Sequence, residues 1–73
     1  MALTIQPIVG TTQVGIHAST SRELHMAITL LTSGFYQVKD VKDDPQDHWH
    51  VATVYAPLRT DIATLRRLLH PLL

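Results

Sequence analysis

The residue types best suited to chemistry or to binding gather in Asp47-His48-Trp49-His50, which holds the only tryptophan and two of the five histidines. His48 and His50 are two residues apart, so on a strand their imidazoles share one face. Such a pair could hold a metal ion if Asp47 or His17 supplied a third ligand. The same pair is also typical of a half-solvated strand face beside a tryptophan. We favour that interpretation and expect neither a metal nor another cofactor.

Two other groups of side chains could serve catalysis. Four aspartates surround one polar turn at positions 40, 43, 44 and 47, where carboxylates could act as acid and base or bind calcium. Pro45 interrupts this run and the spacing of a calcium loop is missing, so a solvated turn is the better interpretation.

Hydroxyl groups at positions 19–21 lie near His17 and His25, as a nucleophile and its base would. No Gly-x-Ser-x-Gly elbow is present, and helix capping by Thr20 explains that residue without chemistry. Two thin layers of this size seldom enclose a water-excluding cleft. The sequence therefore predicts a protein that is not an enzyme.

Composition restricts the class of protein. The chain has 73 residues, no cysteine, and six basic residues against six acidic ones. This length predicts one compact domain over residues 1–73. The lack of cysteine suits a reducing compartment, and neither a signal peptide nor a membrane-spanning run is expected, so the predicted location is the cytoplasm.

Alternation and punctuation by turn residues predict six elements in the order β-β-α-β-β-α. Pro7 indicates that the first strand lies at a sheet edge, and Thr20-Ser21-Arg22-Glu23 matches a capping box at a helix start. Gly34 suits a left-handed position after that helix, and Thr60 could cap the second helix. The predicted strands are residues 3–9, 13–18, 35–41 and 48–56, and the predicted helices follow Thr20 to Ser33 and Thr60 to His70.

The fold class that follows is α+β, a small antiparallel sheet with its helices on one face. The inward face of the fourth strand is ambiguous, because both of its faces carry apolar residues. We predict that Trp49, Val51 and Tyr55 face the helices, since they have the most apolar area to bury, although a one-residue bulge would reverse this.

A protein partner is the predicted ligand. Trp, Tyr and Arg dominate binding hot spots, and the last six residues are unusually apolar for a chain end. The alternative is a small RNA- or DNA-binding domain, in which aromatic side chains stack on bases beside arginines. The zero net charge argues against it. The predicted partner-binding residues are His48, Trp49, His50 and Tyr36, with Arg66 and Arg67 as rim charges.

In its length of 73 residues, its lack of cysteine and its lack of a catalytic motif, the chain resembles the small host-takeover proteins that phages encode. It is similar in size to the RNA polymerase inhibitors of lytic Xanthomonas phages. The resemblance implies a protein that binds bacterial RNA polymerase, disfavours promoter initiation by weakening sigma-factor retention, and can act as an antiterminator. It covers size and general character over the whole chain and supplies no binding residues.

Overall fold

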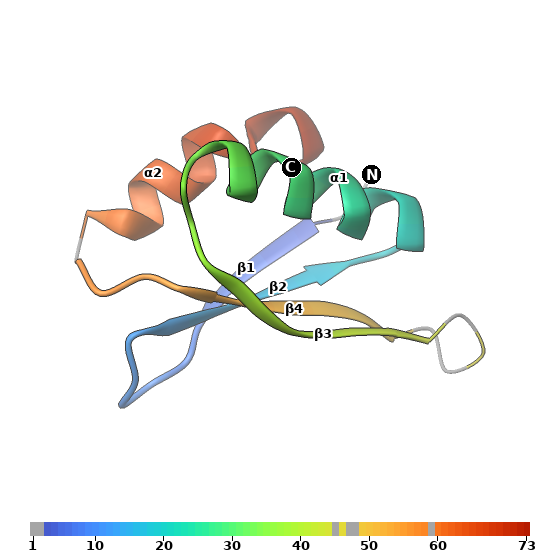
Figure 1. Ribbon diagram of the computed structural model, residues 1–73, viewed down its shortest axis with the longest axis horizontal. Coiled ribbons are helices and arrows are strands. Elements are labelled where there is room, and N and C mark those ends of the chain that lie inside the picture. The colour runs from blue at the N-terminus through green and yellow to red at the C-terminus, as the bar shows by residue number, and fades with distance from the viewer. Residues whose placement is uncertain (1–2, 45, 47–48, 59) are drawn as a thin grey trace.

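The computed structural model describes residues 3–44, 46, 49–58 and 60–73, and for Trp49 it describes the backbone (Figure 1). The predicted order β-β-α-β-β-α is confirmed. The elements are β1 (Leu3–Pro7), β2 (Gln13–Ala18), α1 (Ser21–Ser33), β3 (Val38–Asp44), β4 (Trp49–Tyr55), α2 (Asp61–Leu68) and a short 3₁₀ turn, η1 (His70–Leu72).

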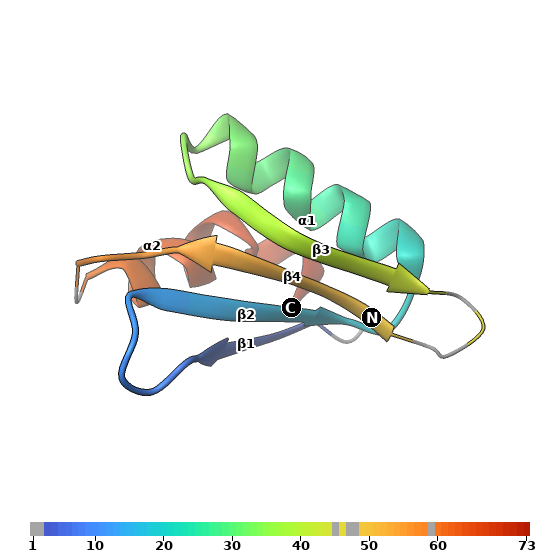
Figure 2. The same ribbon diagram turned by 60° about the horizontal axis from the view of Figure 1, so that its bottom comes forward.

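The four strands form one antiparallel sheet in the order β1-β2-β4-β3. Both helices lie on the same face of this sheet and leave its other face open, which Figures 1 and 2 show from two directions. The α+β class is therefore confirmed. In the described part of the chain, neither helix has the length and apolar character needed to cross a lipid bilayer.

The core lies between the two layers. Opposite Val54 of β4 stands Val14 of β2, and opposite Ala52 stands Ile16, with all four side chains buried. The helices cover them with residues spaced three or four apart, as an amphipathic helix requires. Those buried helix residues are Leu24, Ala27 and Leu31 of α1, and Leu65 of α2, together with Leu69 and Leu72 after it.

The inward face of β4 is the opposite of the one predicted. His50, Ala52 and Val54 are buried against the helices, whereas Tyr55 is 43% exposed and Val51 is partly exposed. The prediction used apolar area alone. The alternation of β4 is satisfied by either face, and the pairing of Ala52 and Val54 with the buried residues of β2 decides it.

A capping box has two hydrogen bonds, and the start of α1 forms one of them. The Glu23 amide donates to Thr20 Oγ1 at 3.1 Å, as expected of an N-cap threonine. The Glu23 carboxylate does not return to the Thr20 amide. It accepts instead from Ser19 Oγ at 2.9 Å, so Glu23 is buried against the residue before the cap.

The end of α1 differs from the prediction at Gly34. Gly34 has φ −84°, and the left-handed residue is Phe35, with φ +64°. The amides of Phe35 and Tyr36 donate to the carbonyls of Thr32 and Leu31, the Schellman pattern that places Phe35 one position after the cap. Gly34 serves close packing, because a Cβ there would lie 2.8 Å from Leu68 Cδ2.

Three strands have bounds that differ from the predicted ones, and of these β4 merely ends one residue earlier, at Tyr55. β1 ends at Pro7 and leaves Val9 almost wholly exposed in the turn, so the predicted strand over residues 3–9 is two residues too long. β3 begins at Val38 and contains a bulge between Lys39 and Lys42, where Asp40 has φ +53°. Aspartate tolerates this left-handed conformation better than most residues, which lets the strand kink there.

The C-terminal segment packs into the core. Leu69 and Leu72 are buried, so the buried side of α2 that begins at Leu65 continues through η1. At the start of α2 the Thr60 side chain makes no capping bond, contrary to the prediction. The side chain that bonds to the backbone at this helix start is Asp61, whose Oδ2 accepts from the Leu58 amide at 2.7 Å.

Candidate functional site

His50 is a buried partner of a carboxylate. Its side chain is 7% exposed, and its Nδ1 lies 2.7 Å from Asp43 Oδ1 on the neighbouring strand. It faces α1 and is therefore removed from solvent rather than presented to a partner. Burial of an imidazole beside a carboxylate satisfies a polar group that would otherwise be costly in the core.

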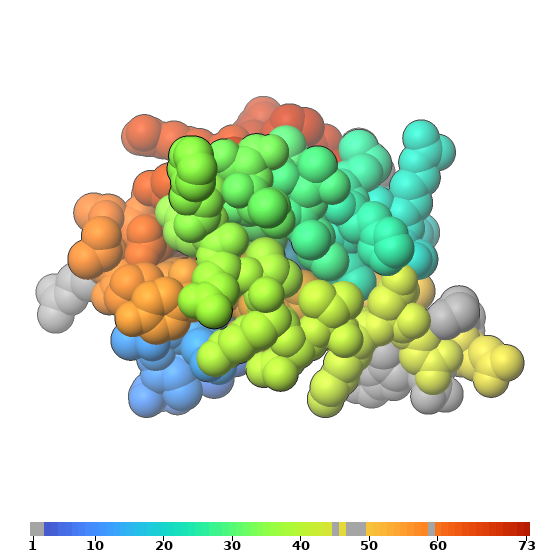
Figure 3. Space-filling view, viewed as in Figure 1, coloured from blue at the N-terminus to red at the C-terminus, as the bar shows by residue number. Residues whose placement is uncertain are grey.

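Asp43 joins three elements at this end of the sheet. Its Oδ2 accepts from Ser21 Oγ at 2.6 Å and lies 3.0 Å from His25 Nε2. Ser21 and His25 belong to α1, which lies against β3 (Figure 3). The hydrogen bonds from Ser21 and then from His50 hold the pKa of the Asp43 carboxyl below its ordinary value. The group ties the start of α1 to the β3–β4 hairpin.

The hydrogen bonds among Ser21, His25, His50 and Asp43 limit the chemistry that these side chains can perform. A serine nucleophile donates to an imidazole that removes its proton. Here Ser21 donates to the Asp43 carboxylate instead, and the imidazoles of His25 and His50 lie against the same carboxylate rather than against the hydroxyl. Across the described ranges, no set of three His, Asp or Glu residues is placed to hold a metal ion.

Tyr36 lies at the opposite end of the sheet from His50. Tyr36 precedes β3, whereas His50 pairs with Asp43 near the end of β3. Tyr36 and Asp43 are separated by about seven residues, or roughly 23 Å along an extended chain. The Tyr36 hydroxyl donates to Asp61 Oδ1 at 3.3 Å. Burial, followed by the negative charge of Asp61, raises the pKa of Tyr36.

The remaining predicted binding residues lie apart from these two. Arg66 and Arg67 are exposed on α2, and Arg66 lies beside β1. The side chain of Trp49 and all of His48 lie outside the described residues, and so does the prediction that Trp49 faces the helices. The structure therefore does not gather the described members of the predicted set on one surface.

Other apolar side chains are exposed in the connections between elements. Three connections, β1–β2, α1–β3 and β4–α2, lie at the same end of the molecule, spread from the helix layer to the edge of the sheet (Figures 1 and 2). Backbone bonds link them, because the Ala56 amide donates to Thr12 and the Tyr55 amide donates to Gln37. We call this the apolar end, since it carries Val9, Phe35, Leu58 and Tyr55, which are 96%, 98%, 65% and 43% exposed.

The sequence contains a local signal for the apolar end, in the glycines and the proline beside its exposed residues. Val9 precedes Gly10, Phe35 follows Gly34, and Leu58 follows Pro57. Glycine and proline mark turns, so large apolar side chains beside them are placed where they cannot be buried by regular structure. Val9 and Phe35 fall within the predicted strands 3–9 and 35–41, whereas the structure places both in connections.

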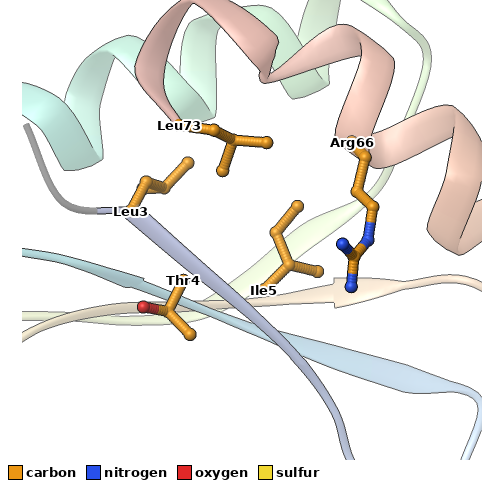
Figure 4. A pocket seen from close by; sticks show the side chains of 5 residues that line it. All are labelled: Leu3, Thr4, Ile5, Arg66 and Leu73. Carbon is orange, nitrogen blue, oxygen red and sulfur yellow. The ribbon is translucent and has the colours of Figure 1, made fainter.

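A groove also runs along the free edge of β1. It has a volume of about 310 Å³ and is lined by Leu3, Thr4, Ile5, Arg66 and Leu73 (Figure 4). Leu3, Ile5 and Leu73 supply apolar walls, and Arg66 reaches down from α2. Arg66 takes part in no ion pair with any residue that the structure describes.

Comparison with known proteins gives no match: no protein-family model, no curated protein and no solved structure is significantly similar to this chain.

Proposed function

We propose that this protein is a non-catalytic regulator that binds another protein through its apolar end. The observation that supports the proposal is the exposure of Val9, Phe35 and Leu58 on three separate connections at the same end of the molecule. Apolar surface exposed outside the core is characteristic of interaction sites.

The backbone at Phe35 adds a second argument. A left-handed conformation costs a residue with a Cβ about 1–2 kcal/mol, and glycine would avoid that cost. Phe35 adopts it while its side chain is 98% exposed, so the ring gains nothing from the core. Strain of this kind often accompanies a functional role, and contact with a partner is the role that a fully exposed aromatic ring can fill.

The partner that the resemblance suggests is bacterial RNA polymerase, met in the bacterial cytoplasm. The mechanism is steric: the bound domain covers a surface of the polymerase, which inhibits transcription initiation and allows antitermination. A standard interface takes about 800 Å² from each partner. That is roughly one-sixth of the 4958 Å² surface of this chain, so the apolar end and its surroundings can supply it.

The test is capture of purified RNA polymerase core and holoenzyme by the tagged protein, with nuclease present. We expect stoichiometric recovery, and at least a tenfold loss of affinity in a Phe35→Gly, Leu58→Ser double variant. Met26→Ser is the matched control, because Met26 is 44% exposed on α1, outside the apolar end. No recovery of polymerase excludes this partner, and equal loss in both variants excludes the apolar end.

A second candidate function, nucleic-acid binding, is favoured by the open face of the sheet. Lys39 pairs with Thr53 and Lys42 pairs with Val51, so both lysines share that face with Tyr55. Cationic side chains beside an exposed aromatic ring suit a single-stranded backbone and its bases. Binding of single-stranded RNA that weakens steeply with salt would support this function, and unchanged affinity between low and high salt would exclude it.

A further inference from the structure

The two edges of the sheet differ in what they offer to another strand. β3, at one edge, carries Lys39, Asp40, Lys42, Asp43 and Asp44 and is kinked by a bulge. Charges and bulges are the usual protection against strand addition. β1, at the other edge, reads Leu-Thr-Ile-Gln-Pro, without a charge or a bulge.

The register shows which peptide groups of β1 point away from the sheet. The Ile8 amide donates to the Gln13 carbonyl at 3.0 Å, in step with the pairing of Pro7 with Val14. Bonded and non-bonded pairs alternate along an antiparallel ladder, so Thr4 and Gln6 also bond to β2. Leu3, Ile5 and Pro7 therefore direct their peptide groups outward: two N–H donors, at Leu3 and Ile5, and three carbonyl acceptors.

These outward groups border the groove that Leu3, Ile5, Arg66 and Leu73 line between β1, α2 and the end of the chain (Figure 4). A free strand edge beside a groove is the arrangement by which an extended peptide adds to a sheet. Main-chain bonds supply affinity there, and side-chain pockets supply specificity.

We infer that the β1 edge is a second binding site, which takes an extended segment of a partner protein with an apolar side chain for the groove and a carboxylate for Arg66. The carboxylate follows from charge complementarity, because Arg66 is the one charged residue among those that line the groove. A second copy of this chain fits less well, since its own β1 brings no acidic residue to Arg66. The inference rests on the proposed function only in that the partner is a protein.

The test uses a capped seven-residue peptide, acetyl-Thr-Val-Thr-Glu-Thr-Val-Thr-amide, in which the valines and the glutamate share one face of an extended chain, and amide hydrogen exchange followed by NMR. In the free protein, the Ile5 amide should exchange fast, whereas the Thr4 and Gln6 amides are protected by β2. Saturating peptide should slow exchange at Ile5 at least tenfold and leave its two neighbours unchanged. An Ile5 amide that exchanges at the same rate with and without peptide overturns the inference.

Specificity is tested with a second peptide, in which lysine replaces the glutamate, and with two protein variants. The glutamate peptide should bind about fivefold more tightly than the lysine peptide, the effect of one partly exposed ion pair. Arg66→Ser should abolish that preference. Arg67→Ser is the matched control, because Arg67 is exposed on the same helix and does not line the groove. Equal binding of both peptides by the unaltered protein overturns the role of Arg66.

The outcomes separate this site from the proposed function. If RNA polymerase is not captured but the peptide protects the Ile5 amide, the proposed partner is wrong and the binding site at the β1 edge is supported. If polymerase binds while neither peptide nor polymerase protects the Ile5 amide, the site at the β1 edge is refuted and the proposed function is supported. Protection of Ile5 that rises with protein concentration in the absence of peptide indicates a second copy at the edge and overturns the inference.

Discussion

Replacing Phe35 with glycine should stabilise the fold while it weakens partner binding. Phe35 has φ +64°, a conformation that costs a residue with a Cβ about 1–2 kcal/mol and glycine almost nothing. The ring is 98% exposed, so its removal leaves no cavity and sacrifices little burial. A strained residue that contributes this little to the core is a position where stability and function oppose each other.

The magnitude follows from two opposing terms. Relief of the left-handed conformation contributes about 1–2 kcal/mol, and the greater freedom of glycine in the unfolded chain removes about 0.5–1 kcal/mol. The net gain in unfolding free energy is therefore about 0.7 kcal/mol, the middle of a range of about 0–1.5 kcal/mol. For a domain of this size that corresponds to a rise in Tm of about 3–6 °C.

The assay is thermal and urea unfolding followed by circular dichroism, with affinity for the captured partner measured on the same samples. Leu58→Ser is the control, because Leu58 is exposed and has no positive φ, so its loss should weaken binding without raising Tm. A lower Tm for Phe35→Gly would refute the reasoning about strain. A raised Tm with unchanged affinity would confirm the strain and remove Phe35 from the binding surface.

Three further predictions concern the fold. Leu72→Ala should lower the unfolding free energy in urea by about 2–5 kcal/mol, because the side chain is buried in the core from the C-terminal turn. Thr20→Ala should lower it by about 1 kcal/mol through loss of the bond from the Glu23 amide. The pKa of Asp43 in the folded protein lies below its unfolded value of 3.8. The ionised carboxylate therefore stabilises the fold above pH 3.8, and this stabilisation is lost as the pH falls through the folded pKa. Acid unfolding of Asp43→Asn should therefore show a smaller fall in stability below about pH 4.

Each of these three predictions has a control or an outcome that would contradict it. Leu73→Ala, at a residue 48% exposed, should cost far less than Leu72→Ala, and equal costs would contradict the packing of the chain end. Thr20→Ser keeps the capping oxygen and should preserve stability. An Asp43→Asn variant that loses as much stability in acid as the unaltered protein would show that other carboxyls carry the acid sensitivity.

Local sequence determined the elements and their order. In α1, the spacing of Leu24, Ala27 and Leu31 and the hydroxyl of Thr20 act within one or two helical turns, so the helix could be predicted without its neighbours. The alternation of β2 likewise indicates Val14 and Ile16 as the apolar side chains of one face, and both are buried. Such signals depend on residues close together in the chain.

Tertiary structure decided the site. The faces of β4 are both apolar enough to be buried, and only the pairing with β2 turned His50 inward to meet Asp43. The apolar end exists because the antiparallel order places three connections at the same end of the molecule, although Val9, Phe35 and Leu58 are far apart in the sequence. The β1 groove likewise joins the first strand to Arg66 on the last helix. These features depend on contacts between distant segments, and local alternation and propensity carry no information about which distant segments will meet.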